Sequence, residues 1–212
     1  MTEQQEQYIL GHIDAEPAHL AALDRDTHVR LLYPHMCSGH LQGRVLKMLV
    51  RMIAPRRVLE LGTYSGYSAQ CLAEGLLDPE AVVHTIEKDD EMEEFIKEHL
   101  SQSPVASRIV LHIGDARQLV PALSTEPWDL VFVDANKRQY EDYYDLVFPH
   151  VRSGGFIIVD NTLWGGKLSD GQLHHDAMTA GISRFNDRVA GDPRVEVVIL
   201  PLRDGLTILR KK

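Results

Sequence analysis

VLELGTYSGYS, residues 58–68, combines the end of a predicted strand with two closely spaced glycines. A strand predicted at residues 57–61 runs directly into Gly62 and Gly66, which indicate a tight turn from a strand into a helix. Glycine accepts the backbone conformations of such a turn and lets a ligand approach the backbone amides at the start of the helix. The stretch therefore predicts a nucleotide-binding turn at the end of the first strand.

Six more short apolar runs mark strands further along the chain. The first five of the seven strands are separated by helix-length segments, which is typical of parallel crossover units with helices on both faces of a sheet. Only residues 201–205 separate the last two, so these form an antiparallel hairpin. The predicted fold class is α/β: a Rossmann-like, doubly wound seven-stranded sheet, mostly parallel, with the last strand antiparallel. The six later strands are expected at residues 82–87, 109–113, 130–134, 156–160, 195–200 and 206–210.

The chain before the glycine turn is predicted to be helical. Between residues 42 and 53 apolar side chains recur at helical spacing, and Pro55 ends the run. No repeat, low-complexity tract or linker divides the sequence. We therefore expect a single domain over residues 1–212.

Composition and charge argue against several classes of protein. The chain is 44% hydrophobic and 25% charged, an ordinary balance for a globular domain. A net charge of −9 repels nucleic acid and anionic membranes. The N-terminus lacks a basic patch followed by an apolar run, and two cysteines are too few for a disulfide framework. We expect a cytoplasmic protein that binds neither nucleic acid nor membranes.

The glycine turn lacks the features of a pyrophosphate site. Dinucleotide-binding loops carry the spacing G-x-G-x-x-G, whereas this turn has just two glycines around residues 63–65. Glu60 would repel a dianion, but it suits an ammonium or sulfonium group such as that of S-adenosylmethionine. Ser68, in the first turn of the next helix, is placed to hold the carboxylate of that ligand. S-adenosylmethionine is the predicted cofactor, and a nicotinamide-dependent dehydrogenase is the rival interpretation.

Acidic residues at the next two strand ends extend the predicted pocket. Glu87 closes the second strand, close to where an acidic residue binds a ribose diol in this fold. Asp115 and Ala116 follow the third strand, where Asp115 can accept a hydrogen bond from the exocyclic amine of adenine. The alternative is that both acids are ordinary surface charges. Their combination with the glycine turn favours the pocket.

The ends of the fourth and fifth strands predict a cation site. Asp134, Asp160 and Asn161 follow adjacent parallel strands and supply three hard oxygen donors, a ligand class that selects magnesium, calcium or manganese over zinc. Positions left open on the cation suit a bidentate vicinal diol. Lys137 is the candidate general base for the hydroxyl proton, a role that requires its neutral form.

Each of these residues also has a more ordinary interpretation. Asp134 can be a helix N-cap, Lys137 a solvated surface lysine, and Asp160 with Asn161 a turn. The predicted catalytic role rests on their shared position at the end of the sheet where ligands bind in this fold.

The sequence resembles the metal-dependent class I O-methyltransferases, the family of catechol O-methyltransferase, caffeoyl-coenzyme A O-methyltransferase and their small bacterial relatives. The likeness runs from about Leu41 to the end of the chain and is strongest in VLELGTYSGYS, LVFVDANK, GGFIIVDNTLWGG and LPLRDGLTILR. It implies methylation of a catechol-like hydroxyl, with Asp134, Asp160 and Asn161 as metal ligands and Lys137 as base. It also implies cofactor contacts by Glu60, Gly62, Tyr64, Ser68, Glu87, Asp115, Ala116 and Asp134.

The resemblance further suggests a homodimer, with the N-terminal segment 1–55 contributing lid and dimer contacts. Two residues depart from the pattern of the family. Asn136 stands where relatives often have aspartate, and Arg203 stands where they usually have glycine. The resemblance therefore does not fix which methyl acceptor this protein prefers.

Residues around the acceptor are predicted from their neighbours. Trp164 follows the metal-binding pair and suits an apolar wall, although plain packing explains it equally well. Met36 is a candidate lid residue, although a methionine more often fills a gap in the packing than contacts a ligand. The tyrosines at 140, 143 and 144 are expected to pack on the sheet, and His174-His175 to lie in a solvated loop rather than a metal cluster.

Two further functions remain open at this point. One is a non-catalytic module that binds S-adenosylmethionine, which would need none of the predicted metal ligands or the lysine. The other is a methyltransferase acting on a non-catechol acceptor or on nitrogen or carbon, which would have little need of an oxygen-lined cation site.

Overall fold

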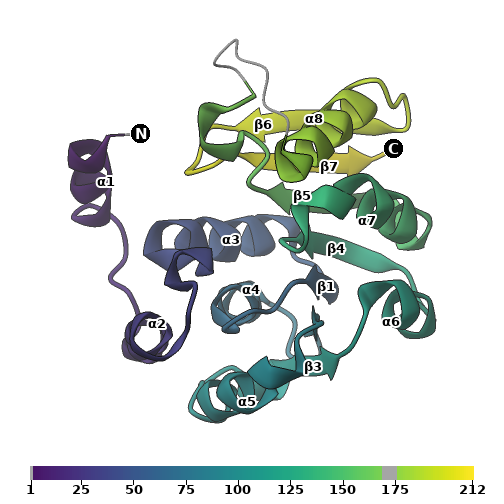
Figure 1. Ribbon diagram of the computed structural model, residues 1–212. Helices are drawn as coiled ribbons and strands as arrows, with labels where there is room; N and C mark the ends of the chain where they lie inside the picture. Colours follow the sequence, from purple (N-terminus) through teal and green to yellow (C-terminus); the bar gives the residue numbers. More distant parts are fainter. Residues whose placement is uncertain (1, 169–175) are drawn as a thin grey trace. The chain divides into compact units, whose positions relative to one another are not determined.

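The computed structural model describes residues 2–168 and 176–212, and the chain forms two compact units. The first unit comprises Met1–Arg56 and Thr63–Gly114, and the second comprises Arg57–Gly62 and Asp115–Lys212. Across the described residues the strands form a seven-stranded sheet in the order β3-β2-β1-β4-β5-β7-β6 (Figure 1). The predicted seven-stranded, mostly parallel fold class is confirmed.

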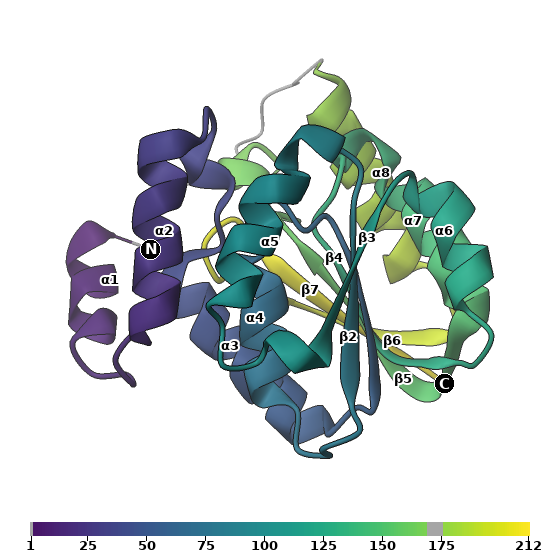
Figure 2. The ribbon, with the colours of Figure 1, turned by 90° about the horizontal axis from the view of Figure 1, so that it is seen from below.

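The first unit contains the helical N-terminal region and the parallel strands β2 and β3. Residues 39–53 form α3, which begins three residues before the helix predicted from residue 42. Figure 2 shows α4 and α5 on one side of β2 and β3. The elements of this unit are α1 (Glu3–Leu10), α2 (Ala18–Arg30), η1 (Pro34–Met36), α3 (Gly39–Ile53), α4 (Tyr67–Gly75), β2 (Val82–Glu87), η2 (Asp90–Met92), α5 (Glu93–Ser101), η3 (Ala106–Arg108) and β3 (Ile109–Ile113).

Two glycines allow α3 and α4 to pack closely. A Cβ atom on Gly43 would lie 2.6 Å from the Sγ atom of Cys71, and one on Gly75 would lie 2.6 Å from the Cβ atom of Val50. Such distances are below van der Waals contact, so each position excludes a larger side chain. The buried residues of this region include Leu20, Leu23, Cys37, Tyr67, Cys71 and Phe95, which form one core cluster.

The second unit contains the other five strands, and β7 is the reversed strand. It pairs antiparallel with β5 on one side and with β6 on the other, which confirms the predicted hairpin. Figure 2 shows α6, α7 and α8 on one side of these strands. The elements are β1 (Arg57–Leu61), α6 (Ala116–Leu123), β4 (Trp128–Val133), η4 (Lys137–Gln139), α7 (Tyr140–Val147), η5 (Phe148–His150), β5 (Val151–Asp160), η6 (Trp164–Gly166), α8 (Ala177–Ala190), β6 (Val195–Leu200) and β7 (Leu206–Lys211).

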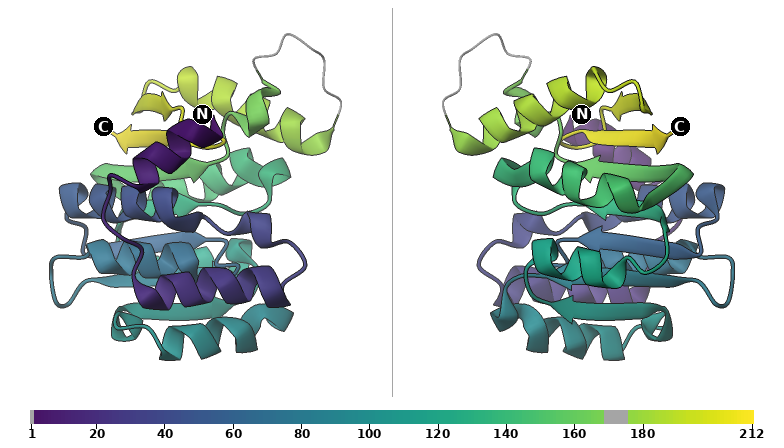
Figure 3. Two further views of the ribbon diagram at one scale, coloured as in Figure 1. Left: turned by 90° about the vertical axis from the view of Figure 1, so that its left-hand side faces the viewer. Right: turned by 90° about the vertical axis from the view of Figure 1, so that its right-hand side faces the viewer.

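Both central strands of the second unit begin earlier than the apolar pattern predicts. Trp128 and Val151 are register partners at the start of the parallel β4–β5 pair. A register irregularity between Trp128 and Leu130 follows, after which the pairing is continuous to Val133 and Val159. In both views of Figure 3, α8 lies beside the β6–β7 hairpin.

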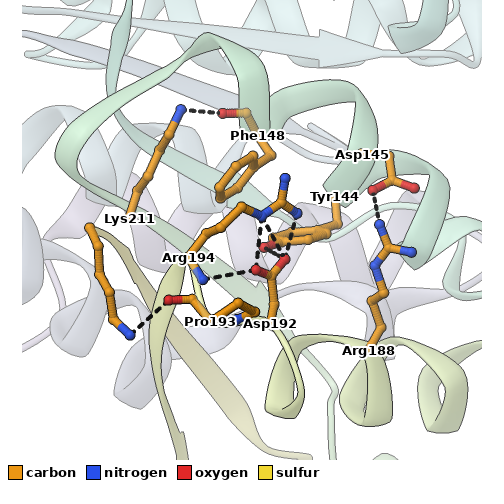
Figure 4. Close-up of polar contacts among 9 residues, drawn as sticks. Tyr144, Asp145, Phe148, Arg188, Asp192, Pro193, Arg194 and Lys211 are labelled. Carbon is orange, nitrogen blue, oxygen red and sulfur yellow. Dashed lines mark hydrogen bonds and ion pairs between the residues drawn. The ribbon is translucent and has the colours of Figure 1, made fainter.

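Polar and aromatic side chains form a network at the end of the second unit where β5 begins (Figure 4). The Asp192 carboxylate accepts hydrogen bonds from the Tyr144 hydroxyl at 2.9 Å and from the Arg194 guanidinium. The Arg194 Cζ atom lies 4.2 Å from the centre of the Phe148 ring, and the Lys211 Nζ atom lies 4.5 Å from it. These contacts join α7 and the following η5 to the loop before β6 and to β7.

None of the helices in the described residues combines the length and the apolar composition needed to cross a bilayer.

Candidate active site

Asp134 and Asp160 come together through the register of two neighbouring strands. Val133 pairs with Val159 in the parallel β4–β5 ladder, and the two aspartates are the next residues on each chain. Neighbouring strands are about 4.8 Å apart, so their backbones leave the sheet side by side. Burial raises the pKa of Tyr140 well above its usual value, and the carboxylates of both Asp134 and Asp160 add to this effect. Both carboxylates therefore act electrostatically on the same phenol.

Lys137 is held directly against the first of these carboxylates. It opens η4, and its Nζ atom lies 2.5 Å from Asp134 Oδ1. The Lys137 and Asp134 side chains are 17% and 14% exposed, so this is not a solvated surface lysine. The N-cap of η4 is Asn136, whose side chain accepts from the backbone N–H of Arg138 at 3.2 Å. The alternative role of Asp134 as a helix cap is thus filled by Asn136.

Asn161 follows Asp160 in a turn of unusual backbone conformation. Its φ of +59° lies in the left-handed region, which asparagine tolerates better than most residues. Its backbone N–H donates to Asp160 Oδ1 at 2.7 Å. Asp160 is 3% exposed, and its backbone carbonyl accepts from the Tyr140 hydroxyl at 2.9 Å. The turn is therefore anchored by a buried carboxylate and by α7.

The chemistry of these residues fits a divalent cation. Asp134, Asp160 and Asn161 offer oxygen atoms and no softer donor, and two carboxylates balance a dication. Asp134 already holds a cationic group, the Lys137 ammonium. In the part of the chain that the structure describes, no three His, Cys, Asp or Glu side chains are placed to share a metal.

The start of the glycine turn contacts Asp134, just after the end of β4. The backbone N–H of Asp134 donates to the carbonyl of Leu61 at 2.9 Å. Gly62 has a φ of +95°, and a Cβ atom there would lie 2.1 Å from the Asp134 carbonyl oxygen. Only glycine fits at this position. Glu60, two residues earlier on β1, is fully buried.

In the first unit, Glu87 holds the rest of the glycine turn. Its Oε2 atom accepts from the backbone N–H of Tyr64 at 2.7 Å. Its Oε1 atom accepts from the N–H groups of Lys88 at 2.8 Å and Asp89 at 2.9 Å. A carboxylate has about four lone-pair sites, so three backbone bonds leave Glu87 able to accept from a ligand as well. Ser68, in the first turn of α4, is 5% exposed.

Met36 lies in the N-terminal region of the first unit, next to the glycine turn. It ends η1 and is 50% exposed. The Tyr64 hydroxyl donates to the carbonyl of Tyr33 at 2.9 Å, so the turn is tied to the segment that carries Met36.

Asp115 has a structural role in the second unit. It caps α6 by accepting from the backbone N–H of Arg117 at 2.9 Å, and it also accepts from the Arg117 guanidinium at 2.7 Å. The predicted adenine partner is therefore also a helix cap. Ala116, the first residue of α6, is buried.

Trp164 is tied to the loop at residues 201–205. The backbone N–H groups of Leu163 and Trp164 donate to the Asp204 carbonyl at 2.7 and 3.1 Å. Arg203 has a φ of +47°, a conformation that glycine adopts without strain. The predicted solvated loop at His174 and His175 lies outside the described residues.

A family model described as O-methyltransferase matches residues 12–212. The chain belongs to the O-methyltransferase family. Catechol O-methyltransferase from Mycobacterium tuberculosis is 34% identical over 78% of this chain and 74% of its own length. Tricin synthase 2 from rice is 31% identical over 84% of this chain, which spans 64% of the rice protein. The predicted class of enzyme, an O-methyltransferase that uses S-adenosylmethionine, is confirmed at the level of the family.

Solved structures of O-methyltransferases match this member of the family along nearly its whole length. The O-methyltransferase TomG of Streptomyces achromogenes, involved in tomaymycin synthesis and solved with S-adenosylmethionine, has a TM-score of 0.89 at 31% identity and 100% coverage of both chains. The O-methyltransferase of Bacillus cereus, solved with S-adenosylhomocysteine, has a TM-score of 0.88 at 27% identity, covering 97% of this chain and 96% of its own.

Sequence reasoning missed two polar residues that hold the Asn161 turn. Tyr140 was expected only to pack, and its ring does so at 1% exposure, but its hydroxyl also reaches the Asp160 carbonyl. Asn186, on α8, donates from Nδ2 to the Thr162 carbonyl at 2.8 Å. Their partners are backbone atoms, which leave no pattern in a sequence.

Proposed function

We propose that this O-methyltransferase transfers the methyl group of S-adenosylmethionine to one hydroxyl of a catechol-like aromatic diol. Asp134, Asp160 and Asn161 hold a divalent cation, Mg²⁺ in the first place and Ca²⁺ or Mn²⁺ as alternatives, and Lys137 is the general base. One observation carries the proposal: two aspartates follow a register pair at adjacent strand ends, with a lysine ammonium on one of them.

The cofactor is assigned to the glycine turn and the strand ends that follow it. Support comes from the relatives solved with S-adenosylmethionine and S-adenosylhomocysteine and from the tight contact between Gly62 and the Asp134 carbonyl. Glu60 offers a negative charge to a sulfonium or ammonium group. The proposed contacts are Glu60, Gly62, Tyr64, Ser68, Glu87, Asp115, Ala116 and Asp134.

The chemistry assigns separate tasks to the residues. A bound dication would lower the pKa of a coordinated phenol and fix both acceptor oxygens. Lys137 Nζ first gives up its own proton to solvent, and the neutral amine then accepts the proton of the acceptor hydroxyl. The phenolic oxygen then forms a bond to the methyl carbon as the carbon–sulfur bond breaks, and the electron pair of that bond returns to sulfur. The remaining acceleration comes from alignment of oxygen, carbon and sulfur.

A vicinal diol is the proposed acceptor because two adjacent oxygens match two open positions on one cation. Relatives named catechol O-methyltransferase and caffeoyl-CoA O-methyltransferase support a phenolic substrate. Trp164 is the proposed aromatic wall of the acceptor site and Met36 the lid. Residues 1–212 are assigned to one methyltransferase domain, with residues 1–55 contributing lid and dimer contacts in a cytoplasmic homodimer.

A methyl-transfer assay tests this proposal. The protein is incubated with labelled S-adenosylmethionine, Mg²⁺ and a panel of catechols and matched monophenols, and products are identified by mass. We expect singly methylated catechols and little product from the monophenols, which offer the cation just one oxygen. Equal turnover of monophenols would contradict the bidentate mechanism. Cofactor binding without any product would favour a binding module instead.

A further inference from the structure

The turn that carries Asn161 is held by side chains from two other elements. Its two flanking carbonyl oxygens, those of Asp160 and Thr162, each accept a hydrogen bond from a side chain of another element. Tyr140 of α7 donates its hydroxyl to Asp160 at 2.9 Å, and Asn186 of α8 donates Nδ2 to Thr162 at 2.8 Å. The Thr207 hydroxyl adds a buried bond of 2.8 Å to the hydroxyl of Thr162. The turn is therefore held on both sides of Asn161.

Such support is needed because the backbone of the turn is strained. Asn161 has a φ of +59°, and left-handed non-glycine residues persist where the surrounding structure over-determines them. A turn free to relax would change the directions in which Asp160 and Asn161 present their oxygens. The support must also be rigid, because a metal site requires its ligands to be held within about 0.5 Å.

The same two helices also hold the segment that carries Lys137. Tyr140 begins α7 directly after η4, so its hydroxyl bond joins the lysine segment to the end of β5. On α8, a Cβ atom at Gly181 would lie 2.6 Å from the Lys137 carbonyl oxygen, so this helix packs directly against that backbone. Both α7 and α8 therefore contact the base segment and the metal-ligand turn.

We propose that Tyr140 and Asn186 are positioning residues that set the geometry of the Asp160–Asn161 metal ligands relative to Lys137. This inference rests on the proposed function. Neither side chain is assigned to the cation, the cofactor or the acceptor. Their effect passes through two backbone carbonyls, and removing either donor leaves an acceptor unsatisfied beside the ligands.

The test uses full-length Tyr140→Phe and Asn186→Ala variants. The readout is Mn²⁺ affinity, measured without acceptor by the electron paramagnetic resonance signal of free Mn²⁺. Outer-shell partners of metal ligands contribute about 10–100-fold to metal affinity, so we expect each variant to bind Mn²⁺ about 10-fold more weakly. Cofactor affinity should stay within about 2-fold of wild type, and Tyr140→Phe should raise the metal concentration required for half-maximal activity.

Tyr144→Phe is the matched control. Tyr144 is on the same helix and equally buried, but its hydroxyl bonds to Asp192 at the other end of β5 (Figure 4). This variant should lose thermal stability and keep wild-type Mn²⁺ affinity. If Tyr140→Phe and Asn186→Ala lose stability but also keep wild-type affinity, the two residues are structural and the inference is wrong.

Asp160→Ala separates this inference from the function on which it rests. If Asp160→Ala binds Mn²⁺ as tightly as wild type, or wild type does not bind it, the proposed cation site fails and the positioning role fails with it. If Asp160→Ala abolishes binding while Tyr140→Phe and Asn186→Ala have no effect, the site stands and only the positioning role is overturned.

Discussion

Asp134 and Asp160 stand one residue beyond the register pair Val133 and Val159, at the ends of two adjacent parallel strands. The two carboxylates of the proposed cation site are therefore placed by sheet pairing, and the turn after β5 adds Asn161. Side chains alternate between the faces of a strand, so a slip of one residue in β5 would turn Asp160 away from Asp134. The buried apolar residues of both strands oppose such a slip, and in this way the core fixes the site.

Replacing Lys137 tests the proposed base. Lys137→Ala should lower kcat by about 10²–10⁴-fold, the usual contribution of a general base, and leave cofactor affinity unchanged. Lys137→Arg should not restore turnover, because a guanidinium stays protonated. Steady-state kinetics and a binding titration measure both effects. Lys97→Ala, at an exposed lysine of α5, is the control. A Lys137→Arg variant as active as wild type would show that proton transfer to this residue is not required.

Gly62→Ala tests the contact between the glycine turn and the Asp134 strand end. The added Cβ atom would lie 2.1 Å from the Asp134 carbonyl oxygen in a residue with φ of +95°. We expect a loss of more than about 2 kcal/mol of unfolding free energy, together with weaker cofactor binding. Gly39→Ala has a similar φ of +72° but nothing within 4 Å, so it isolates the cost of the backbone conformation. Denaturant titrations that give equal losses for both variants would argue against the close contact.

Much of this fold follows from the sequence because its central strands are buried. Parallel strands covered on both faces are nearly continuous apolar runs, and glycine or proline marks their ends. β4 and especially β5 begin earlier than this pattern predicts: Ser153-Gly-Gly155 precedes the apolar run, yet β5 begins at Val151, which pairs with Trp128. A pairing partner more than twenty residues away leaves no local signal.

Some residues of the candidate site can be identified from the sequence, and others cannot. The sequence points to Asp134, Lys137, Asp160 and Asn161 as candidates because residues that follow the strands bind ligands in this fold, and the structure places Lys137 against Asp134. The hydrogen bonds from Tyr140 and Asn186 to backbone carbonyls were not predictable, because any residue at position 160 or 162 supplies such an acceptor. The same holds for Glu87, whose carboxylate accepts from three backbone N–H groups.

Asp192 should make stability depend on pH in the acid range. Its hydrogen bonds from the Arg194 guanidinium hold the pKa of this carboxyl well below its usual value, despite opposing desolvation. A carboxyl with a lowered folded-state pKa contributes stability above its unfolded pKa of about 3.9, and this stability is lost as pH falls toward the folded-state value. Melting temperatures of wild type and Asp192→Asn should therefore differ at pH 7 and converge below about pH 4. A constant difference would exclude this linkage.

Both thiols should be inert in the folded protein. Burial raises the pKa of Cys37 to about 12, and it raises the pKa of Cys71 as well. Because the thiolate is the reactive form, a thiol reagent such as DTNB at pH 8 should react with neither residue until denaturant is added, when two thiols should titrate. Rapid reaction of one thiol in the native protein would show that its surroundings open to solvent.

The most direct test of the proposed mechanism is methyl transfer to a catechol after removal of divalent cations by EDTA, with Mg²⁺ titrated back. Wild-type protein should lose its activity with chelator and recover it with Mg²⁺, whereas Asp160→Ala should bind S-adenosylmethionine normally and recover little activity at any Mg²⁺ concentration. Transfer at the wild-type rate in EDTA, or full activity of Asp160→Ala, would contradict a catalytic cation at these two strand ends.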